Sequence, residues 1–419
     1  MQTICVLGLG YIGLPTASVL ATKGHRVLGV DINQRAVDTI NRGEIHIHEP
    51  DLDILVKSAV LSGNLTASTT PAKADTFIIA VPTPFSEGHV PDLSYIESAV
   101  RSMADVVEPG NLIILESTSP VGATEKIAQW LRELRPDLKI PNRRTTPPVA
   151  GEERRGRIYL AHCPERVLPG QILRELVDND RIIGGIDPES ADKAAELYRS
   201  FVSGEIVCTD SRTAELAKLT ENAFRDVNIA FANELSIICD ELQIDVWELI
   251  RLANRHPRVN ILQPGPGVGG HCIAVDPWFI VHSSPEHARL IRTAREVNDS
   301  KPHVVLNKIM QRAARIKDPV IACLGLSFKA DVDDLRESPA LEIVHELASR
   351  GVGKLLVVEP HIKELPASLK NDGLELVPLE EALPAADLIV ALVNHKQFTR
   401  VDRQLLNEKI VIDTRGIWR

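Results

Sequence analysis

A cysteine in a glycine-rich segment is the residue of this chain best suited to covalent chemistry. Cys272 lies within the sequence Gly-Val-Gly-Gly-His-Cys-Ile-Ala-Val-Asp, residues 267–276. Unpaired cysteines often serve only as small buried apolar residues, but a thiolate can also add to an aldehyde carbonyl. Loss of a hydride from that adduct leaves a thioester, which water hydrolyses to an acid. A thiol working with a hydride-accepting cofactor therefore predicts oxidation of an alcohol, through an aldehyde, to an acid.

The N-terminal residues predict such a cofactor. Gly8, Gly10 and Gly13 follow an apolar strand, Thr3–Leu7, and precede a helical run, after which a second strand ends at Asp31. This order is typical of dinucleotide-binding folds, in which the glycines allow a tight turn and the pyrophosphate lies against the helix N-terminus. An acid at position 31 accepts hydrogen bonds from ribose hydroxyls and repels a 2′-phosphate. The pattern favours NAD over NADP.

Two polar turns follow further strand candidates, 77–81 and 112–115, and contain Thr83 and Thr118. Ligands bind at the carboxyl ends of strands in open α/β sheets. We expect both threonines to contact the cofactor; the alternative is that each hydroxyl serves only its own turn.

The region from Ser211 to about Leu242 shows helical periodicity without proline or glycine. A helix of this length is predicted to span domains or to build a subunit interface. Lys218, Asn222 and Arg225 share one face of it because they are spaced by four and three residues. That face is either functional or merely solvated.

The last hundred residues repeat the first in outline. Residues 321–329 align with residues 4–12, and three more strand candidates follow. Ser327 replaces the second glycine and Ala330 the third, so this turn is not expected to cradle a pyrophosphate with its backbone. Lys329 and Arg336 add positive charge, which favours a nucleotide-linked substrate over a second cofactor. The alternative is that both are solvent-facing charges.

The composition excludes several classes of function. The chain has 419 residues, a formal net charge of −10 and 44% apolar residues. This balance argues against nucleic-acid binding, and no apolar run approaches the ~18 residues that cross a bilayer. The six cysteines lack metal-ligand spacing, so we expect reduced thiols, no metal and no membrane. The chain opens on a strand in place of a signal peptide, which predicts a cytoplasmic location.

Ordered sequence blocks extend over nearly the whole chain: 8–13, 117–122, 163–170, 218–234, 254–279, 325–339 and 413–419. Together they resemble the UDP-glucose/GDP-mannose dehydrogenase family and are closest to the branch that oxidises UDP-N-acetyl-D-mannosamine. The resemblance implies four-electron oxidation of the C6 alcohol to UDP-N-acetyl-D-mannosaminuronate, with two NAD and one water, for surface polysaccharide synthesis. The covalent thiohemiacetal and thioester would form on Cys272.

The resemblance also implies residue roles. Lys218 would donate and accept protons, Asn222 would supply hydrogen bonds, and Glu165 and Asp276 would order or activate the hydrolytic water. The implied cofactor contacts are Gly8, Gly10, Tyr11, Ile12, Gly13, Asp31, Thr83, Thr118 and Arg336. The implied substrate contacts are Arg166, Val167, Lys218, Asn222, Arg225, His256, Arg258, Gly269, Phe328, Lys329 and Arg415. Arginine and lysine suit a diphosphate because they form charge-assisted hydrogen bonds.

The expected fold is α/β, with two doubly wound, Rossmann-like parallel-sheet domains joined by a long central helix. Residues 1–205 form the NAD-binding domain. Residues 206–305 form a helical domain with the catalytic cysteine and a homodimer interface, and 306–419 form the UDP-sugar-binding domain. The polar, proline-rich loop at 139–157 is assigned no chemistry.

Three alternatives remain. The same chemistry could act on UDP-glucose, GDP-mannose, UDP-GlcNAc or UDP-GalNAc. A two-electron β-hydroxyacid dehydrogenase would release one NADH per substrate and would not need Cys272. A non-catalytic, NAD-responsive binding protein would form no product from any nucleotide sugar.

Overall fold

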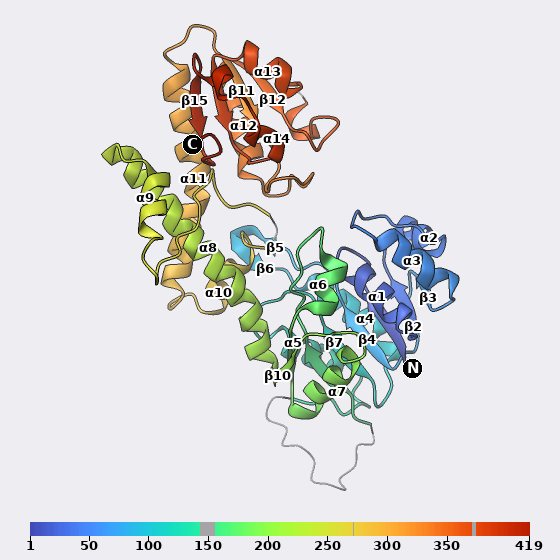
Figure 1. Ribbon diagram of the computed structural model, residues 1–419. Helices are drawn as coiled ribbons and strands as arrows, with labels where there is room; N and C mark the ends of the chain where they lie inside the picture. The colour runs from blue at the N-terminus through green and yellow to red at the C-terminus, as the bar shows by residue number, and fades with distance from the viewer. Residues whose placement is uncertain (143–155, 271, 371–373) are drawn as a thin grey trace. The chain divides into compact units, whose positions relative to one another are not determined.

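The structure is a computed structural model that describes residues 1–142, 156–270, 272–370 and 374–419 (Figure 1). Two compact units, Met1–Thr220 and Glu221–Arg419, divide the chain. Each is described here by itself. Helix α8 (Ser211–Leu242) begins in the first unit and continues into the second.

The first unit is built on an eight-stranded sheet with the strand order β10-β9-β8-β7-β4-β1-β2-β3. Its strands are β1 (Thr3–Leu7), β2 (Arg26–Val30), β3 (Leu65–Ser68), β4 (Thr76–Ile79), β7 (Leu112–Leu115), β8 (Tyr159–His162), β9 (Arg181–Gly185) and β10 (Ile206–Asp210). Its other helices are α1 (Gly13–Thr22), α2 (Gln34–Asn41), α3 (Leu52–Leu61), α4 (Ser94–Met103), α5 (Ala123–Leu134), α6 (Ile172–Asp178) and α7 (Pro188–Tyr198). A short hairpin, β5 (Phe85–Ser86) and β6 (Val90–Pro91), precedes α4.

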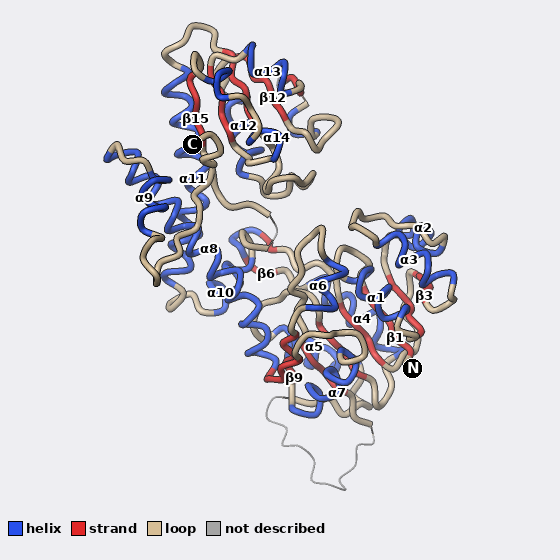
Figure 2. Tube along the Cα trace, viewed as in Figure 1, coloured by secondary structure: helices blue, strands red, loops and turns tan. Residues whose placement is uncertain are grey.

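Successive side chains of the central strand β1 enter two different cores, because a strand alternates its side chains between the faces of the sheet. Ile4 and Val6 pack with residues of α1, α3, α6 and α7, whereas Cys5 and Leu7 pack with residues of α4 and α5. The sheet therefore carries helices on both faces, as the tube in Figure 2 also shows.

One detail differs from the expected all-parallel sheet. β8 and β9 pair antiparallel, through Ala161 with Gly185 and His162 with Gly184, while the other neighbouring strands of this sheet pair in parallel. The chain leaves β8, forms α6 and re-enters the sheet from the opposite end. Reversed strands toward the edge of a mostly parallel sheet are common in large α/β folds.

The second unit combines helices with a smaller sheet. Its helices beyond α8 are α9 (Val246–Ala253), α10 (Asp276–Ser283), α11 (Arg289–Ala313), α12 (Pro339–Ser349), α13 (Leu379–Ala385) and α14 (Lys396–Thr399). Its strands are β11 (Val320–Leu324), β12 (Lys354–Val358), β13 (Glu375–Leu376), β14 (Leu388–Ala391) and β15 (Ile410–Asp413), in the order β13-β12-β11-β14-β15 and parallel throughout.

This sheet repeats the alternation of the first. Ile321 and Cys323 pack with α11 and α12 on one face, and Ala322 and Leu324 pack with α13 and α14 on the other. The fold is therefore α/β, with two Rossmann-like sheets and the long helix α8, as expected. α8 has the bounds that its uninterrupted periodicity predicts.

Within the described ranges, none of the helices combines the length and apolarity that crossing a bilayer requires. The six cysteines are thiols. The predicted loop at 139–157 falls largely on residues 143–155, which lie outside the described residues.

Candidate active site

The turn between β1 and α1 has the shape that a pyrophosphate requires. Gly8 has φ of +91°, and a Cβ there would lie 2.7 Å from the carbonyl oxygen of Ala80. A Cβ on Gly13 would collide with the carbonyl of Gly8, whereas a Cβ on Gly10 would meet no atom within 4 Å. The turn is thus tightly packed toward the protein and open at Gly10. Residues present here fit a dinucleotide.

The helix behind this turn presents its N-terminus. α1 begins at Gly13, and its preceding residue, Ile12, supplies no side-chain cap. Tyr11 is exposed and Ile12 half-buried. In this turn Leu14 N and Thr16 N donate to Gly10 O and Ile12 O at 3.1 Å each, and Pro15 has no N–H. The N–H of Gly13 is therefore the group of this turn that can face an anion.

Asp31 lies where β2 ends, beside the glycine turn. Its Oδ2 accepts a hydrogen bond from Leu9 N at 2.9 Å, and its Oδ1 accepts one from Asn33 N at 2.9 Å. These bonds fix the carboxylate, and each oxygen retains a lone pair for a ribose hydroxyl.

The two predicted threonines meet at the carboxyl ends of β4 and β7. The Thr83 hydroxyl donates to the carbonyl oxygen of Thr118. The Thr83 proton is therefore engaged in joining two turns, and its oxygen remains an acceptor. Contact of either threonine with the cofactor stays a prediction.

Glu165 follows β8 and is buried in an ion pair. Its Oε2 lies 2.6 Å from Nη1 of Arg181, and its Oε1 accepts Arg166 N at 2.7 Å. Arg181 is 1% exposed and Glu165 6%. Val167 packs partly buried against the core that also holds α6. A buried carboxylate with two such partners is held in a single orientation.

A second carboxylate lies behind Glu165. Glu116 accepts hydrogen bonds from Tyr198 at 3.0 Å and from Thr16 at 3.2 Å. Burial, reinforced by the charge of Glu165 and opposed by Arg181, raises the pKa of Glu116 to about 7. Next to the Glu165–Arg181 pair, the first unit therefore holds a carboxyl group, that of Glu116, whose pKa lies near neutral pH.

In the second unit, the segment around Cys272 leads into α10. The carbonyl of Cys272 accepts backbone N–H groups of Val275 at 3.1 Å and of Asp276 at 2.9 Å. Cys272 is exposed, while Asp276, the first residue of α10, is 4% exposed. Asn222 Nδ2 on α8 donates to Asp276 Oδ2 at 2.5 Å. The structure thus brings three predicted residues together by joining α8 to the cysteine segment.

The glycines before Cys272 allow close packing against the part of the second unit that is built on strands β11–β15, here called the C-terminal sheet domain. A Cβ on Gly270 would lie 2.9 Å from Cε2 of Phe328, and a Cβ on Gly269 would lie 2.7 Å from Cδ of Pro339 and 3.0 Å from Cβ of Phe328. A Cβ on Gly267 would lie 2.9 Å from Cβ of Pro339. The predicted substrate residues Gly269 and Phe328 are therefore neighbours.

Arg415 is held beside the same segment. A Cβ on Gly265 would contact its guanidinium, and its Nη2 donates to Asn394 Oδ1 at 3.1 Å. The amide of Gly265 in turn donates to Asn233 Oδ1 on α8 at 2.9 Å.

The remaining predicted residues are more accessible. Lys218 is half-buried on the part of α8 that belongs to the first unit. Five basic residues of the second unit are exposed: Arg225, His256, Arg258, Lys329 and Arg336. Arg336 pairs with Asp334 at 2.6 Å, and Arg258 N donates to His256 Nδ1 at 3.3 Å. Their roles in binding stay predictions.

Sequence reasoning missed several buried polar groups that shape these regions. Glu215 on α8 accepts Gly122 N at 2.6 Å and Thr124 N at 2.8 Å, so it caps α5 from a distant part of the chain. Burial raises the pKa of Glu215, against the effect of these hydrogen bonds. Glu49 accepts Gly170 N and Ile172 N at 2.9 and 2.8 Å. For Glu215 the sequence carried one hint: α5 begins after Gly122, which has no side chain that could cap the helix.

Comparison with known proteins covers the whole chain. Three domains of the UDP-glucose/GDP-mannose dehydrogenase family match in order: the NAD binding domain at residues 2–202, the central domain at 212–300 and the UDP binding domain at 322–419. An NDP-N-acetyl-D-galactosaminuronic acid dehydrogenase of Ralstonia nicotianae is 64% identical over 417 residues, covering 100% of this chain and 96% of its own. A UDP-N-acetyl-D-mannosamine dehydrogenase of Escherichia coli K12 is 58% identical over 426 residues, covering 100% and 99%.

A solved structure agrees with these matches. A UDP-D-ManNAc dehydrogenase from Pyrococcus horikoshii superposes with a TM-score of 0.85 at 40% identity, covering 100% of this chain and 96% of that one. The glycine turn with Asp31 lies in the part that matches the NAD binding domain, so NAD is the cofactor. The chain belongs to the UDP-glucose/GDP-mannose dehydrogenase family.

Proposed function

We propose that the protein oxidises the C6 alcohol of UDP-N-acetyl-D-mannosamine to the carboxylate, in four electrons, with two NAD and one water. The ordered match of NAD binding, central and UDP binding domains over nearly the whole chain carries this proposal. The relative from Escherichia coli, named for this substrate, supports the choice of sugar.

We assign the covalent steps to Cys272. NAD, when bound, accepts the hydride of each oxidation. Once C6 is an aldehyde, the thiolate forms an S–C bond and the carbonyl oxygen takes a proton. Departure of the C6 hydride and of that proton leaves a thioester. Water then attacks the thioester carbon and the S–C bond breaks. The Cys272 thiolate is regenerated, the carboxylate is released, and the two protons of the water pass to a neighbouring base and to solvent.

Other residues are assigned to proton transfer and orientation. Lys218 exchanges protons with the reacting oxygen, and Glu165 or Asp276 orders the water. The short Asn222–Asp276 hydrogen bond supports a positioned carboxylate near the cysteine segment. The buried pair with Arg181 supports a fixed orientation of the Glu165 side chain.

A second candidate is the same chemistry on NDP-N-acetyl-D-galactosamine. The relative of Ralstonia nicotianae is named for the galactosaminuronic acid and shares 64% identity. The two substrates differ in ring stereochemistry and need no change in the covalent steps.

The test is a panel of UDP-N-acetyl-D-mannosamine, UDP-GalNAc, UDP-GlcNAc, UDP-glucose and GDP-mannose, with NADH counted per substrate consumed. The proposal predicts two NADH per molecule and the highest kcat/KM with UDP-N-acetyl-D-mannosamine. Preference for UDP-GalNAc would select the second candidate. One NADH per molecule would refute the thioester route.

The thiol has a matched control. Cys272→Ser is expected to stall turnover, whereas Cys208→Ser removes another exposed thiol and should leave kcat unchanged. Near-normal turnover of the Cys272 variant would exclude the covalent role.

We also propose that the protein forms a homodimer through α8. Phe224, Phe231, Ile238 and Leu242 are 68%, 54%, 42% and 61% exposed. The first three are spaced by seven residues and so share a face, and contiguous exposed apolar side chains mark interaction sites. Asp226, Asn233 and Asp240, on the opposite face, bond to α11 or to residue 265.

Phe231→Glu is expected to convert a dimer to a monomer by light-scattering mass, because the charge would be buried without a partner. Leu405→Glu, at another exposed leucine, is the control. A monomeric wild-type protein would contradict the proposal.

Six thiols support a reducing, cytoplasmic location. The uronate product suits surface polysaccharide synthesis.

A further inference from the structure

The segment Ser327–Asp331 joins β11 to the rest of the C-terminal sheet domain and carries Phe328 and Lys329. Phe328 N donates to Asp334 O at 3.1 Å, and the Ser327 hydroxyl donates to Lys329 O at 2.7 Å. Asp331 has φ of +60°, a conformation that non-glycine residues rarely adopt. Contacts from outside the segment therefore contribute to holding this conformation.

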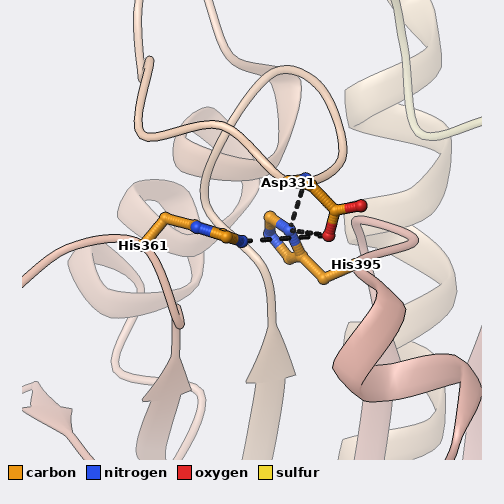
Figure 3. A group of neighbouring side chains, drawn as sticks. All are labelled: Asp331, His361 and His395. Carbon is orange, nitrogen blue, oxygen red and sulfur yellow. Dashed lines mark hydrogen bonds and ion pairs between the residues drawn. The ribbon is translucent and has the colours of Figure 1, made fainter. Parts of the chain in front are cut away.

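His395, which immediately precedes α14, contacts the segment at both ends. Its Nδ1 accepts the backbone N–H of Asp331 at 2.9 Å, and its Nε2 lies 3.3 Å from Ser327 Oγ. Figure 3 shows the ring of His395 directed at Asp331. Because Nδ1 is an acceptor, the ring proton belongs on Nε2. One imidazole therefore bonds on both sides of Lys329.

The ring of His395 is itself firmly held. It is 0% exposed, and its Nε2 lies 3.1 Å from Oε2 of Glu359. Phe398 packs edge-on against it with centroids 5.2 Å apart. Burial opposes ionisation of Glu359, but hydrogen bonds from His395 and from backbone amides prevail and lower its pKa. Glu359 thus remains a carboxylate, and the single Nε2 proton is shared between its Oε2 at 3.1 Å and Ser327 Oγ at 3.3 Å.

The neighbouring His361 raises the question of a metal site. The ligand atoms of Asp331, His361 and His395 all lie within 4.8 Å of one another. A metal ion would need the Nδ1 lone pair of His395, which the amide of Asp331 already uses. His361 Nε2 lies 3.9 Å from Asp331 Oδ1, beyond hydrogen-bonding distance. The geometry favours a hydrogen-bonded support for the segment over a coordinated ion.

We propose that His395 is a positioning residue that holds Ser327–Asp331, and with it Phe328 and Lys329, in the conformation that binds the uridine diphosphate part of the substrate. The inference rests on the proposed function for the identity of the ligand. The backbone N–H of Asp331 has its partner in Nδ1 of His395, while the Asp331 carboxylate also accepts Lys396 N at 3.0 Å. At the Ser327 end the backbone N–H groups have a different partner, because Glu359 Oε2 accepts Leu326 N and Ser327 N at 2.7 and 3.1 Å.

This difference between the two ends makes the inference testable with isosteric variants. His395→Asn keeps an acceptor near the Nδ1 position and loses the Nε2 donor. His395→Gln keeps a donor near the Nε2 position and loses the Nδ1 acceptor. His361→Asn removes the adjacent imidazole, which makes no bond to the segment backbone, and serves as the matched control.

UDP affinity would be measured by calorimetry on the full chain, together with hydrogen exchange at the amide of Asp331. His395→Gln and His395→Ala should raise the Kd for UDP about tenfold, or about 1.4 kcal/mol, and speed this exchange. His395→Asn should stay within about threefold of wild type in Kd, as should His361→Asn. Thermal stability should fall for both Asn and Gln at position 395, so a merely structural role would not separate their UDP affinities.

Unchanged UDP affinity and unchanged Asp331 exchange in His395→Gln would overturn the inference, as would equal losses of UDP affinity in the Asn and Gln variants. A wild-type protein that binds no UDP would count against the proposed function. Hydrogen exchange would still decide whether His395 holds the segment.

Discussion

Gly270→Ala tests whether the cysteine segment depends on close packing against the C-terminal sheet domain. Gly270 has φ of +83°, and an added Cβ would lie 2.9 Å from Cε2 and 3.0 Å from Cδ2 of Phe328. Carbon atoms attract best at about 3.5–4.0 Å, so the ring or the segment must move by about half an ångström.

The cost has two parts. A left-handed backbone conformation costs alanine roughly 1–2 kcal/mol, and overpacking costs about 1–3 kcal/mol. We expect Gly270→Ala to lower the free energy of unfolding by ~2–5 kcal/mol. Gly351→Ala isolates the first part, because Gly351 has φ of +60° and its Cβ would meet nothing within 4 Å. That control should lose only ~1–2 kcal/mol.

The assay is urea unfolding followed by tryptophan fluorescence, which samples the second unit well because Trp247, Trp278 and Trp418 lie in it. Adding Phe328→Leu to Gly270→Ala should recover about 1–3 kcal/mol as a coupling energy in a double-mutant cycle. Additive losses, or equal losses in the Gly270 and Gly351 variants, would refute the packing argument. Because Cys272 is two residues away, kcat of Gly270→Ala should also fall, by about tenfold to a hundredfold.

Three further predictions concern charged groups. Arg181→Leu leaves Glu165 buried without its partner and should cost about 3–5 kcal/mol of unfolding free energy, whereas Arg174→Leu, which breaks an exposed pair, should cost less than about 1 kcal/mol; equal losses by urea unfolding would contradict this. Burial lowers the pKa of Lys301 to about 8, below the value of 10.5 that an unfolded chain retains, so the unfolded state binds more protons between these values. Wild-type stability should therefore rise as the pH increases from 8 to about 10.5, and a Lys301→Met variant that kept the same rise in urea titrations would disprove it. Asp31→Asn should increase kcat/KM with NADP relative to NAD, because a negative charge near the 2′-phosphate is removed; an unchanged ratio would show that Asp31 does not select the cofactor.

The fold was largely predictable because its signals are local. The glycine turn and Asp31 lie within one strand-helix-strand unit, and α8 lacks helix breakers from Ser211 to Leu242. Short strands such as β13 were missed, since two residues, Glu375 and Leu376, carry no periodicity. The reversal of β9 was missed because strand direction depends on how the chain returns to the sheet, which no local pattern encodes.

The candidate site was predictable only in its residue types. The family resemblance named Asn222 and Asp276, but their hydrogen bond joins positions 54 residues apart. The structural roles of Glu215 and His395 were not predictable, because their hydrogen-bond partners lie 91 and 64 residues away in the sequence. A buried polar residue acquires its role from partners that folding brings to it, so its sequence neighbours carry little of that information.

The carboxylate of Glu359 helps to explain why the turn after β11 differs from the turn after β1 in what it can bind. Asp31 directly follows β2 and accepts the amide of Leu9, whereas Glu359, which directly follows β12 and is one methylene longer, accepts the amides of both Leu326 and Ser327. In the C-terminal turn, a carboxylate of the protein therefore already occupies the backbone amides of Leu326 and Ser327. Replacing Ser327 and Ala330 with glycine would leave these amides bonded to Glu359, so they would not become available to a pyrophosphate. The extra methylene of Glu359 thus lets one carboxylate engage two amides of its turn, where Asp31 engages one.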